Sequence, residues 1–260
     1  MEVVIVPTAA DIGVVVADAV SALLARRADA VLGLATGSSP LPVYDELIRR
    51  CRSGSISFAH ASAFLLDEYV GLPAGHPQSY REVIESAFTG RVDFAPGAVH
   101  GPDGNAADLS AAGADYEEAI IAARGIDLQL LGIGADGHIA FNEPGSSLGS
   151  TTRIKSLTSA TREANARFFA HLDDVPHHVL TQGVGTILRA RHLVLVAAGA
   201  DKAAPVAAAV EGPVTSMVPA SALQLHRHAT IVVDESAAAQ LRLADYYREA
   251  FAGKSVWQGL

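Results

Sequence analysis

Hydrophobic residues occur in short continuous runs that alternate with longer segments in which apolar positions lie three or four residues apart. The short runs, rich in valine, isoleucine and leucine, are typical of strands buried on both faces, and the wider spacing is typical of helices that cover a sheet. In the first such segment, Thr8 and Asp11 form a candidate capping box, and Val20 and Leu24 continue the apolar stripe. We therefore expect strands at 2–6, 31–35, 62–66, 127–133, 192–198, 214–218 and 229–233, and helices after Thr8 and at 40–50, 106–124, 161–172, 202–211 and 236–251.

The regular alternation of strands and helices indicates βα units. It predicts an α/β protein with an open, mainly parallel sheet and helices on both faces, a Rossmann-like three-layer sandwich. No Ser/Pro-rich linker, low-complexity tract or internal repeat divides the chain, so we expect a single domain over residues 1–260. Segment 143–182 is the most irregular part and is expected to be the most mobile.

Composition and charge narrow the class of protein. Half of the 260 residues are hydrophobic, which is enough for a core without disulfides or a structural metal. The 19 Lys and Arg against 28 Asp and Glu give a net charge of −9, which argues against nucleic-acid and membrane-surface binding. The single cysteine, Cys51, rules out a disulfide framework. With no signal-peptide pattern and no apolar run long enough for a membrane span, we expect a cytoplasmic protein.

Ligands bind beyond the carboxyl ends of the strands in open parallel sheets, so the residues after each predicted strand are the first candidates. Residues 36–40 read Thr36-Gly37-Ser38-Ser39-Pro40 and lie between a strand and a helix. Backbone N–H groups, hydroxyls and a helix N-terminus in such a loop suit an anion, although an ordinary strand-to-helix turn has the same composition. The loop lacks the Gly-Lys-Ser/Thr ending of a nucleotide P-loop.

Asp67 directly follows the predicted strand 62–66. A carboxyl group at the end of a buried apolar strand has a raised pKa, which is what a general base requires. The alternative is that this acid only caps the next turn.

A glycine-rich loop at 132–145 carries the densest group of polar residues. It contains a formal G-x-G-x-x-G, but Pro144 interrupts the helix that a dinucleotide site needs, and no acid follows about 20 residues on. What remains is a loop that presents Asp136, His138 and Glu143. A carboxylate bound to one imidazole nitrogen fixes the tautomer and leaves the other nitrogen for proton transfer. His138 is therefore a candidate catalytic residue, against the simpler alternative of a surface or core histidine.

Positive charge gathers in one segment of this acidic chain. Residues 151–170 contain Arg153, Lys155, Arg162 and Arg167 against one acid, and Lys202 follows a later strand. Such residues are often merely solvated, but together with the 36–39 loop they would form a phosphate site. The pairs His177-His178 and His226-x-His228 lack a third ligand at a known spacing, so we expect no metal site.

Several of these segments together resemble the glucosamine-6-phosphate deaminases. The loop Gly134-Ala135-Asp136-Gly137-His138-Ile139-Ala140-Phe141-Asn142-Glu143-Pro144 is the most specific part. The sister family, the 6-phosphogluconolactonases, shares the Asp-Gly-His segment but not its Phe-Asn-Glu-Pro continuation. The similarity also covers Gly33–Pro40, Leu66–Leu72, Thr181–Thr186, Ala208–Gly212 and Leu223–His226, and so nearly the whole chain.

The resemblance implies the conversion of glucosamine 6-phosphate and water to fructose 6-phosphate and ammonia, without a cofactor. His138 matches the family's ring-opening residue, oriented by Asp136 and Glu143, and Asp67 matches the base that moves a proton from C2 to C1. The phosphate would be held by Thr36, Gly37, Ser38, Ser39, Arg167 and Lys202.

The resemblance also implies a lid over 153–182 and, in some members, a hexamer activated by N-acetylglucosamine 6-phosphate. Ser146, Arg153 and Lys155 match positions of that effector site. Tyr246 and Tyr247 do not align cleanly with the family's allosteric tyrosine, and Val218-Pro219 replaces an expected Trp-Thr pair, so allostery and the homo-oligomer are less firmly implied than catalysis. A lactonase and a non-catalytic sugar-phosphate-binding regulator are the alternatives; no helix-turn-helix region supports the latter.

Overall fold

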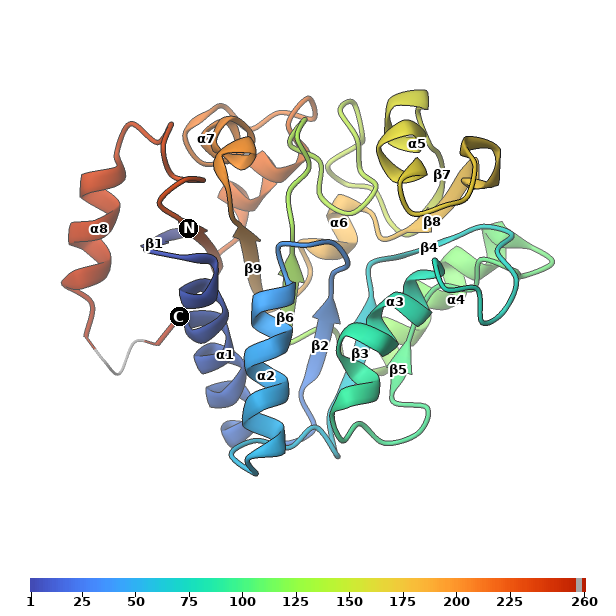
Figure 1. Ribbon diagram of the computed structural model, residues 1–260, viewed down its shortest axis with the longest axis horizontal. Coiled ribbons are helices and arrows are strands. Elements are labelled where there is room, and N and C mark those ends of the chain that lie inside the picture. Colours follow the sequence, from blue (N-terminus) through green and yellow to red (C-terminus); the bar gives the residue numbers. More distant parts are fainter. Residues whose placement is uncertain (256–258) are drawn as a thin grey trace.

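A computed structural model describes residues 1–255 and 259–260 and contains two β-sheets (Figure 1). The larger sheet has seven strands, all parallel, in the order β1-β10-β9-β6-β2-β3-β5. The smaller sheet has three antiparallel strands in the order β4-β8-β7. The strands are β1 (Glu2–Val6), β2 (Val31–Leu34), β3 (Ser62–Leu65), β4 (Asp67–Tyr69), β5 (Val99–His100), β6 (Leu128–Leu131), β7 (Arg153–Ser156), β8 (His178–Thr181), β9 (His192–Ala197) and β10 (Ala229–Asp234).

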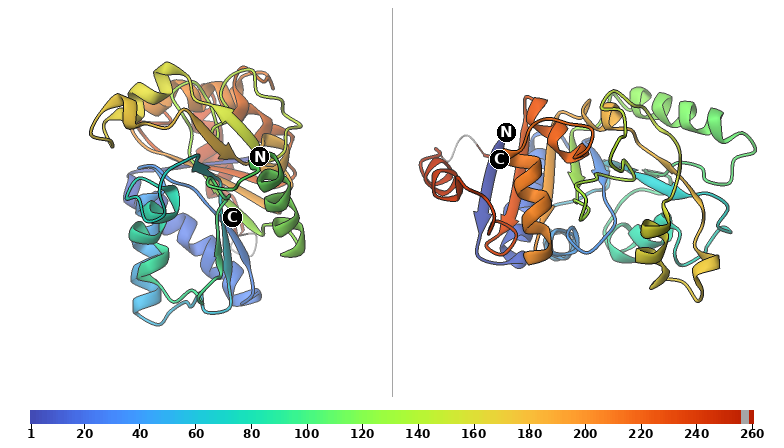
Figure 2. Two further views of the ribbon diagram at one scale, coloured as in Figure 1. Left: turned by 90° about the vertical axis from the view of Figure 1, so that its right-hand side faces the viewer. Right: turned by 90° about the horizontal axis from the view of Figure 1, so that it is seen from above.

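Helices cover both faces of the larger sheet and produce the expected three layers (Figure 2). One face packs against α1, α2 and α3, and the other against α4, α6 and α7. The short helix α5 lies in the predicted lid, and α8 stands beside the edge strand β1 (Figure 1). The helices are α1 (Ala9–Arg26), α2 (Leu41–Arg52), α3 (Tyr80–Ala87), α4 (Leu109–Ala122), α5 (Ser159–Ala166), α6 (Val184–Ile187), α7 (Ala203–Glu211) and α8 (Ala244–Ala252).

The continuous apolar runs become central strands because each of their two faces meets a helix layer. In β9, Leu193 and Leu195 join the core on one side, and Val194 and Val196 join the core on the other. All four side chains are at most 1% exposed. This burial on both faces explains why the sequence shows runs rather than alternation. The predicted fold class is confirmed.

Three predicted elements differ in the structure. Residues 214–218 form a turn closed by an isolated bridge between Thr215 and Val218, because the segment folds back and Ser221 binds the amide of Thr215. Only the second half of the helix expected at 236–251 is helical, as α8 (Ala244–Ala252). The residues before it form turns, and the Asp234 carboxyl group accepts the amide of Ala237. The helix expected at 161–172 runs instead from Ser159 to Ala166. It begins two residues earlier than expected because the Thr158 side chain caps its N-terminus. The capping box of Thr8 and Asp11 is present.

The smaller sheet was not predicted from the sequence. Its strands β7 and β8 lie within segment 143–182 and have four residues each, and β7 alternates between half-buried and exposed positions, so they leave little hydrophobic signal. Its third strand, β4, follows β3 after the single residue Leu66, so the chain passes from one sheet to the other at the carboxyl end of β3.

Among the described residues, no helix has the length and apolarity to span a membrane.

Candidate active site

The strand order brings the predicted site residues to one edge of the larger sheet. Neighbouring strands β9, β6, β2 and β3 are parallel, so their carboxyl ends lie at the same edge. The segments that follow them carry, in that order, Lys202, the loop 134–145, the loop 36–39 and Asp67. Segments far apart in the chain therefore become neighbours at the place where ligands bind in sheets of this kind.

Asp67 is the first residue of β4 and its side chain is buried, with 5% of the residue exposed. Among the described residues, no hydrogen bond reaches its carboxyl group. Burial, aided by the nearby Glu68 carboxylate, raises the pKa of Asp67 from 3.8 to about 8. A carboxyl group with this pKa exchanges a proton readily near neutral pH, as a general base must.

The neighbouring acid, Glu68, caps a turn of the chain, which was the alternative role for Asp67. Its carboxylate accepts the amides of Tyr80 and Arg81, at 2.9 and 3.0 Å, and the hydroxyl of Ser79 at 3.0 Å. These groups form the N-terminus of α3, where a negative charge is favourable. Glu68 therefore caps this helix, whereas the Asp67 carboxyl group accepts no hydrogen bond from any residue that the structure describes.

His138 lies in the loop after β6, with Asp136 beside it. Oδ1 of Asp136 accepts the His138 amide at 3.1 Å, and the same oxygen lies 2.6 Å from Nδ1 of the ring without the angle of a hydrogen bond. The ring packs on the backbone of Gly134, where an added Cβ would lie 2.1 Å from the imidazole Cε1. This position therefore accepts only glycine while the ring stays in place. The other nitrogen, Nε2, has no hydrogen-bond partner among the described residues.

Glu143 ends the same loop, and its contacts differ from those expected. Its Oε1 accepts the hydroxyls of Thr158, at 3.3 Å, and Thr161. Thr158 is the N-cap of α5 in the predicted lid, and Thr161 lies in the first turn of that helix. The carboxyl group of Glu143 is thus held by the lid, while the contact to the His138 ring comes from Asp136.

The loop 134–145 and Asp67 both contact Thr181 of β8. The backbone of Asp67 pairs with Thr181 across the smaller sheet, and the Thr181 hydroxyl accepts the amide of Phe141 at 3.2 Å. The neighbouring Asn142 donates to the Gln182 carbonyl at 2.8 Å. These contacts hold the loop that carries His138 against β8, the strand that pairs with β4.

The 36–39 loop presents its backbone to the same edge. Tyr44 of α2 binds both the amide and the carbonyl of Ala35, at 3.1 and 2.7 Å, and fixes the start of the loop. Gly37 has a φ of +98°, a conformation that favours glycine. The amides of residues 37–39 donate no hydrogen bond within the described residues. Because Pro40 and Pro42 lack N–H groups, the loop amides rather than the first turn of α2 are available to an anion.

The two predicted phosphate-binding cations lie on either side of this region. Lys202 ends a short 3-10 helix after β9; its side chain is 19% exposed and its Nζ is 3.5 Å from the Asp201 carboxylate. Arg167 directly follows α5, and its guanidinium lies 4.7 Å from the ring centre of Phe168. The structure places Lys202 at the predicted edge, whereas Arg167 points to a neighbouring lid residue and makes no hydrogen bond to the 36–39 loop.

The three residues matched to an effector site lie on β7 and before it. Arg153 and Lys155 are two residues apart on β7 and so share one face of that strand. Burial lowers the pKa of Arg153. Ser146 is 4% exposed, and its hydroxyl has no hydrogen-bond partner among the described residues.

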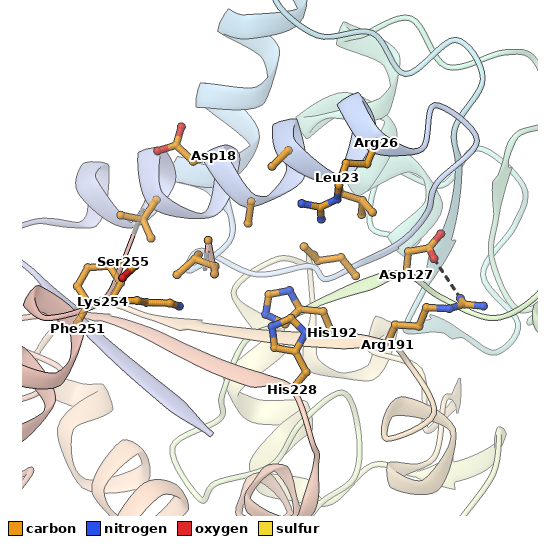
Figure 3. A pocket seen from close by; sticks show the side chains of 16 residues that line it. Asp18, Leu23, Arg26, Asp127, Arg191, His192, His228, Phe251, Lys254 and Ser255 are labelled. Carbon is orange, nitrogen blue, oxygen red and sulfur yellow. Dashed lines mark hydrogen bonds and ion pairs between the residues drawn. The ribbon is translucent and has the colours of Figure 1, made fainter. Parts of the chain in front are cut away.

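A separate cavity of about 850 Å³ lies at the opposite edge of the larger sheet (Figure 3). Asp127, His192 and His228 line it near the amino ends of β6, β9 and β10. Its Asp127 and Arg191 form an ion pair at 3.1 Å. This position, away from the predicted site residues, separates the cavity from the candidate active site. In the described part of the chain, no group of three or more His, Cys, Asp or Glu side chains is placed to hold a metal ion.

Four lid and strand residues at the site were not predicted from the sequence. Thr158 and Thr161 hold Glu143, and Asn165 donates to the hydroxyl of Tyr69 at 2.9 Å. The available signal was the spacing of the three lid residues, which places them on one face of a helix that begins at Ser159. Without the location of that helix, its partner loop could not be identified.

Similar proteins show which family has this arrangement. A family model described as glucosamine-6-phosphate isomerases/6-phosphogluconolactonase matches residues 7–232. A glucosamine-6-phosphate deaminase of Arthrobacter sp. (strain FB24) is 64% identical, and one of Mycolicibacterium smegmatis is 62% identical, each over the full length of both chains.

Solved structures agree with the sequence relatives. One described as a monomeric glucosamine-6-phosphate deaminase, a missing link of the NagB superfamily, is 39% identical with a TM-score of 0.89 and covers 92% of this chain and 100% of its own. A 6-phosphogluconolactonase of Trypanosoma cruzi is 18% identical, with a TM-score of 0.71 and coverage of 93% and 97%, and shares the fold. The resemblance expected from the motifs is confirmed, and this chain belongs to the family of glucosamine-6-phosphate isomerases and 6-phosphogluconolactonases.

Proposed function

We propose that this protein converts glucosamine 6-phosphate and water to fructose 6-phosphate and ammonia. The observation that carries the proposal is Asp67, a buried carboxyl group whose pKa is raised to about 8 at the sheet edge that also carries His138. A hydrolase of lactones needs no carbon acid to be deprotonated, whereas an aldose–ketose isomerisation does. The full-length similarity to deaminases supports the same choice.

The proposed reaction begins with ring opening. His138, oriented by Asp136, takes the proton of the C1 hydroxyl and returns a proton to the ring oxygen as the C1–O5 bond breaks. The open aldehyde makes the C2 proton acidic. Asp67 then removes the proton from C2, and as O1 takes up a proton from solvent the electron pair forms the C1=C2 double bond of the enolamine. Asp67 delivers its proton to C1, and the nitrogen lone pair forms an iminium at C2. Water adds to this carbon, ammonia leaves and one proton returns to solvent, so the atoms balance without a cofactor.

Phosphate binding would position the sugar for these steps. Lys202 and the free amides of residues 37–39 suit the 6-phosphate, with the hydroxyls of Thr36, Ser38 and Ser39 as further donors. We propose that Arg167 joins them when the lid over 153–182 closes. Binding of this remote group holds C1 and C2 against Asp67 and thereby contributes to the rate.

The finer features of the family are part of the same proposal. Arg153, Lys155 and the unpartnered hydroxyl of Ser146 would bind N-acetylglucosamine 6-phosphate as an effector. A solved relative is described as monomeric, so the effector response and any homo-oligomer require separate measurement. A cytoplasmic location and one domain over 1–260 remain predictions.

The direct test is the release of ammonia and fructose 6-phosphate from glucosamine 6-phosphate in equal amounts. The Asp67→Asn variant should lose this activity, and Asp115→Asn, an exposed acid on α4, should keep it. Hydrolysis of 6-phosphogluconolactone without deamination would replace the proposal with the lactonase. Sugar-phosphate binding without any product would replace it with the regulator.

A further inference from the structure

One face of α5 contacts both segments that carry the proposed catalytic residues. Thr161 and Asn165 are four residues apart and so lie on the same side of the helix. Thr161 donates to Glu143 of the loop after β6, and Asn165 donates to the Tyr69 hydroxyl at 2.9 Å, two residues after Asp67. The ring of Phe169 packs edge-on against Tyr69, with ring centres 5.8 Å apart.

The hydroxyl contacts on Glu143 are arranged around a single oxygen. Thr161 and Thr158 both donate to Oε1. The two hydroxyls are also 2.9 Å from each other, and the Thr158 oxygen accepts the amide of Thr161 at 3.2 Å as the helix cap. Within the described residues, Oε2 of Glu143 has no hydrogen-bond partner. The lid therefore fixes the direction of this carboxyl group and leaves its second oxygen available.

The helix is itself tied to the rest of the predicted lid. The Arg162 guanidinium donates to the carbonyls of Leu172, at 2.9 Å, and Val175, at 3.1 and 3.2 Å. Movement of this segment would therefore move Thr161 with it. When α5 leaves the body of the protein, Glu143 loses both hydroxyl donors and becomes free to rotate.

We propose that Thr161 is a positioning residue that couples the seating of α5 to the orientation of Glu143. The inference rests on the proposed function, with Glu143 acting in ring opening from the same loop as His138, five residues after it. Thr161 touches neither substrate nor phosphate in this account. Its contribution is to hold Glu143 in one orientation for ring opening only while α5 is seated on the loop, so that the open-chain aldehyde forms beneath a seated helix.

Kinetics test the proposal with three variants. Thr161→Val keeps the branched shape and removes the hydroxyl, Thr161→Ser keeps the hydroxyl, and Ser159→Ala is an exposed control on the same helix. We expect Thr161→Val to lower kcat about tenfold or more, the loss typical of a hydrogen bond to a charged group, with KM within about twofold. Thr161→Ser and Ser159→Ala should stay near wild-type kcat. Unchanged kcat in Thr161→Val, or a rise in KM alone, would overturn the proposal.

Hydrogen exchange without substrate separates this inference from the proposed function. Thr161→Val and Glu143→Ala should each speed amide exchange in α5 by roughly tenfold, and the double variant should show little further change beyond Glu143→Ala, because the contact between these two side chains is absent in both single variants. Additive effects, or no effect, would refute the contact even if the wild-type enzyme deaminates. A wild type that releases no ammonia would refute the function, while the exchange data would still decide whether the contact holds the lid.

Discussion

The buried carboxyl group of Asp67 should cost the protein stability. Its pKa is about 8 in the folded chain against an ordinary value of 3.8, so folding opposes ionisation. Below pH 3.8 both states carry the proton and there is no cost; above it, stability falls until the pH passes the folded pKa. At about 1.4 kcal/mol per pH unit, the cost reaches roughly 4 kcal/mol at pH 7. Asp67→Asn removes the charge and keeps the shape.

Urea unfolding of the wild type and Asp67→Asn at pH 5, 6, 7 and 8 measures this cost. We expect the variant to be more stable by about 2 kcal/mol or more at pH 7, since its amide still bears part of the burial penalty of a polar group. The advantage should grow with pH up to about 8 and shrink toward pH 5. Asp115→Asn should show no such pH-dependent gain. A variant less stable than the wild type at pH 8, or an advantage independent of pH, would refute the reasoning.

Three further predictions concern the same residues and the opposite edge of the sheet. If Asp67 is the base, kcat/KM should rise about tenfold per pH unit below the pKa of about 8 and level off above it, and a pH-independent profile from 6 to 9 would contradict this. Gly134→Ala should lower kcat about a hundredfold or more, because its Cβ displaces the His138 ring; circular dichroism should confirm the fold, and near-normal turnover would exclude the packing argument. Burial lowers the pKa of His192, whose Nε2 is 2.9 Å from the Thr230 hydroxyl, to about 3. The unfolded chain therefore takes up this proton first, and stability, complete above pH 6.5, should fall by about 1.4 kcal/mol per pH unit below it. Because Asp67 gives the wild type an opposite slope over the same range, the test uses Asp67→Asn as the parent. Urea unfolding at pH 7.5, 6.5 and 5.5 should show the loss in Asp67→Asn and not in the double variant Asp67→Asn/His192→Gln, and equal slopes in these two proteins would count against it.

The layers of the fold could be predicted because they depend on local periodicity. Strands such as 192–198 are continuous apolar runs, and helix α1 begins with a capping box, so each signal lies within a few neighbouring residues. The smaller sheet could not be predicted in this way. β4 is three residues long and begins with two acids, and β7 alternates between half-buried and exposed positions, so pairing with β8 rather than local preference creates these strands.

The same distinction applies to the candidate site. Asp67 and the pair Asp136 and His138 were identifiable because each lies next to a recognisable strand or glycine turn. The partners of Glu143 were not, because they come from α5, whose start the apolar pattern placed two residues too late. Long-range side-chain contacts depend on how loops fold over the sheet, and the sequence pattern does not contain that information.

The placement of β8 between β4 and β7 has a mechanical consequence. Thr181 pairs with Asp67 on one side and with Arg153 on the other. The segment 157–177 leaves the smaller sheet from β7 and returns to it at β8, so both of its supports belong to the sheet that begins with Asp67. His138 follows the larger sheet instead. Because hydrogen-bonded strands move together, a displacement of this segment would pass through β8 to Asp67, and the proposed lid and the proposed base would move as one unit.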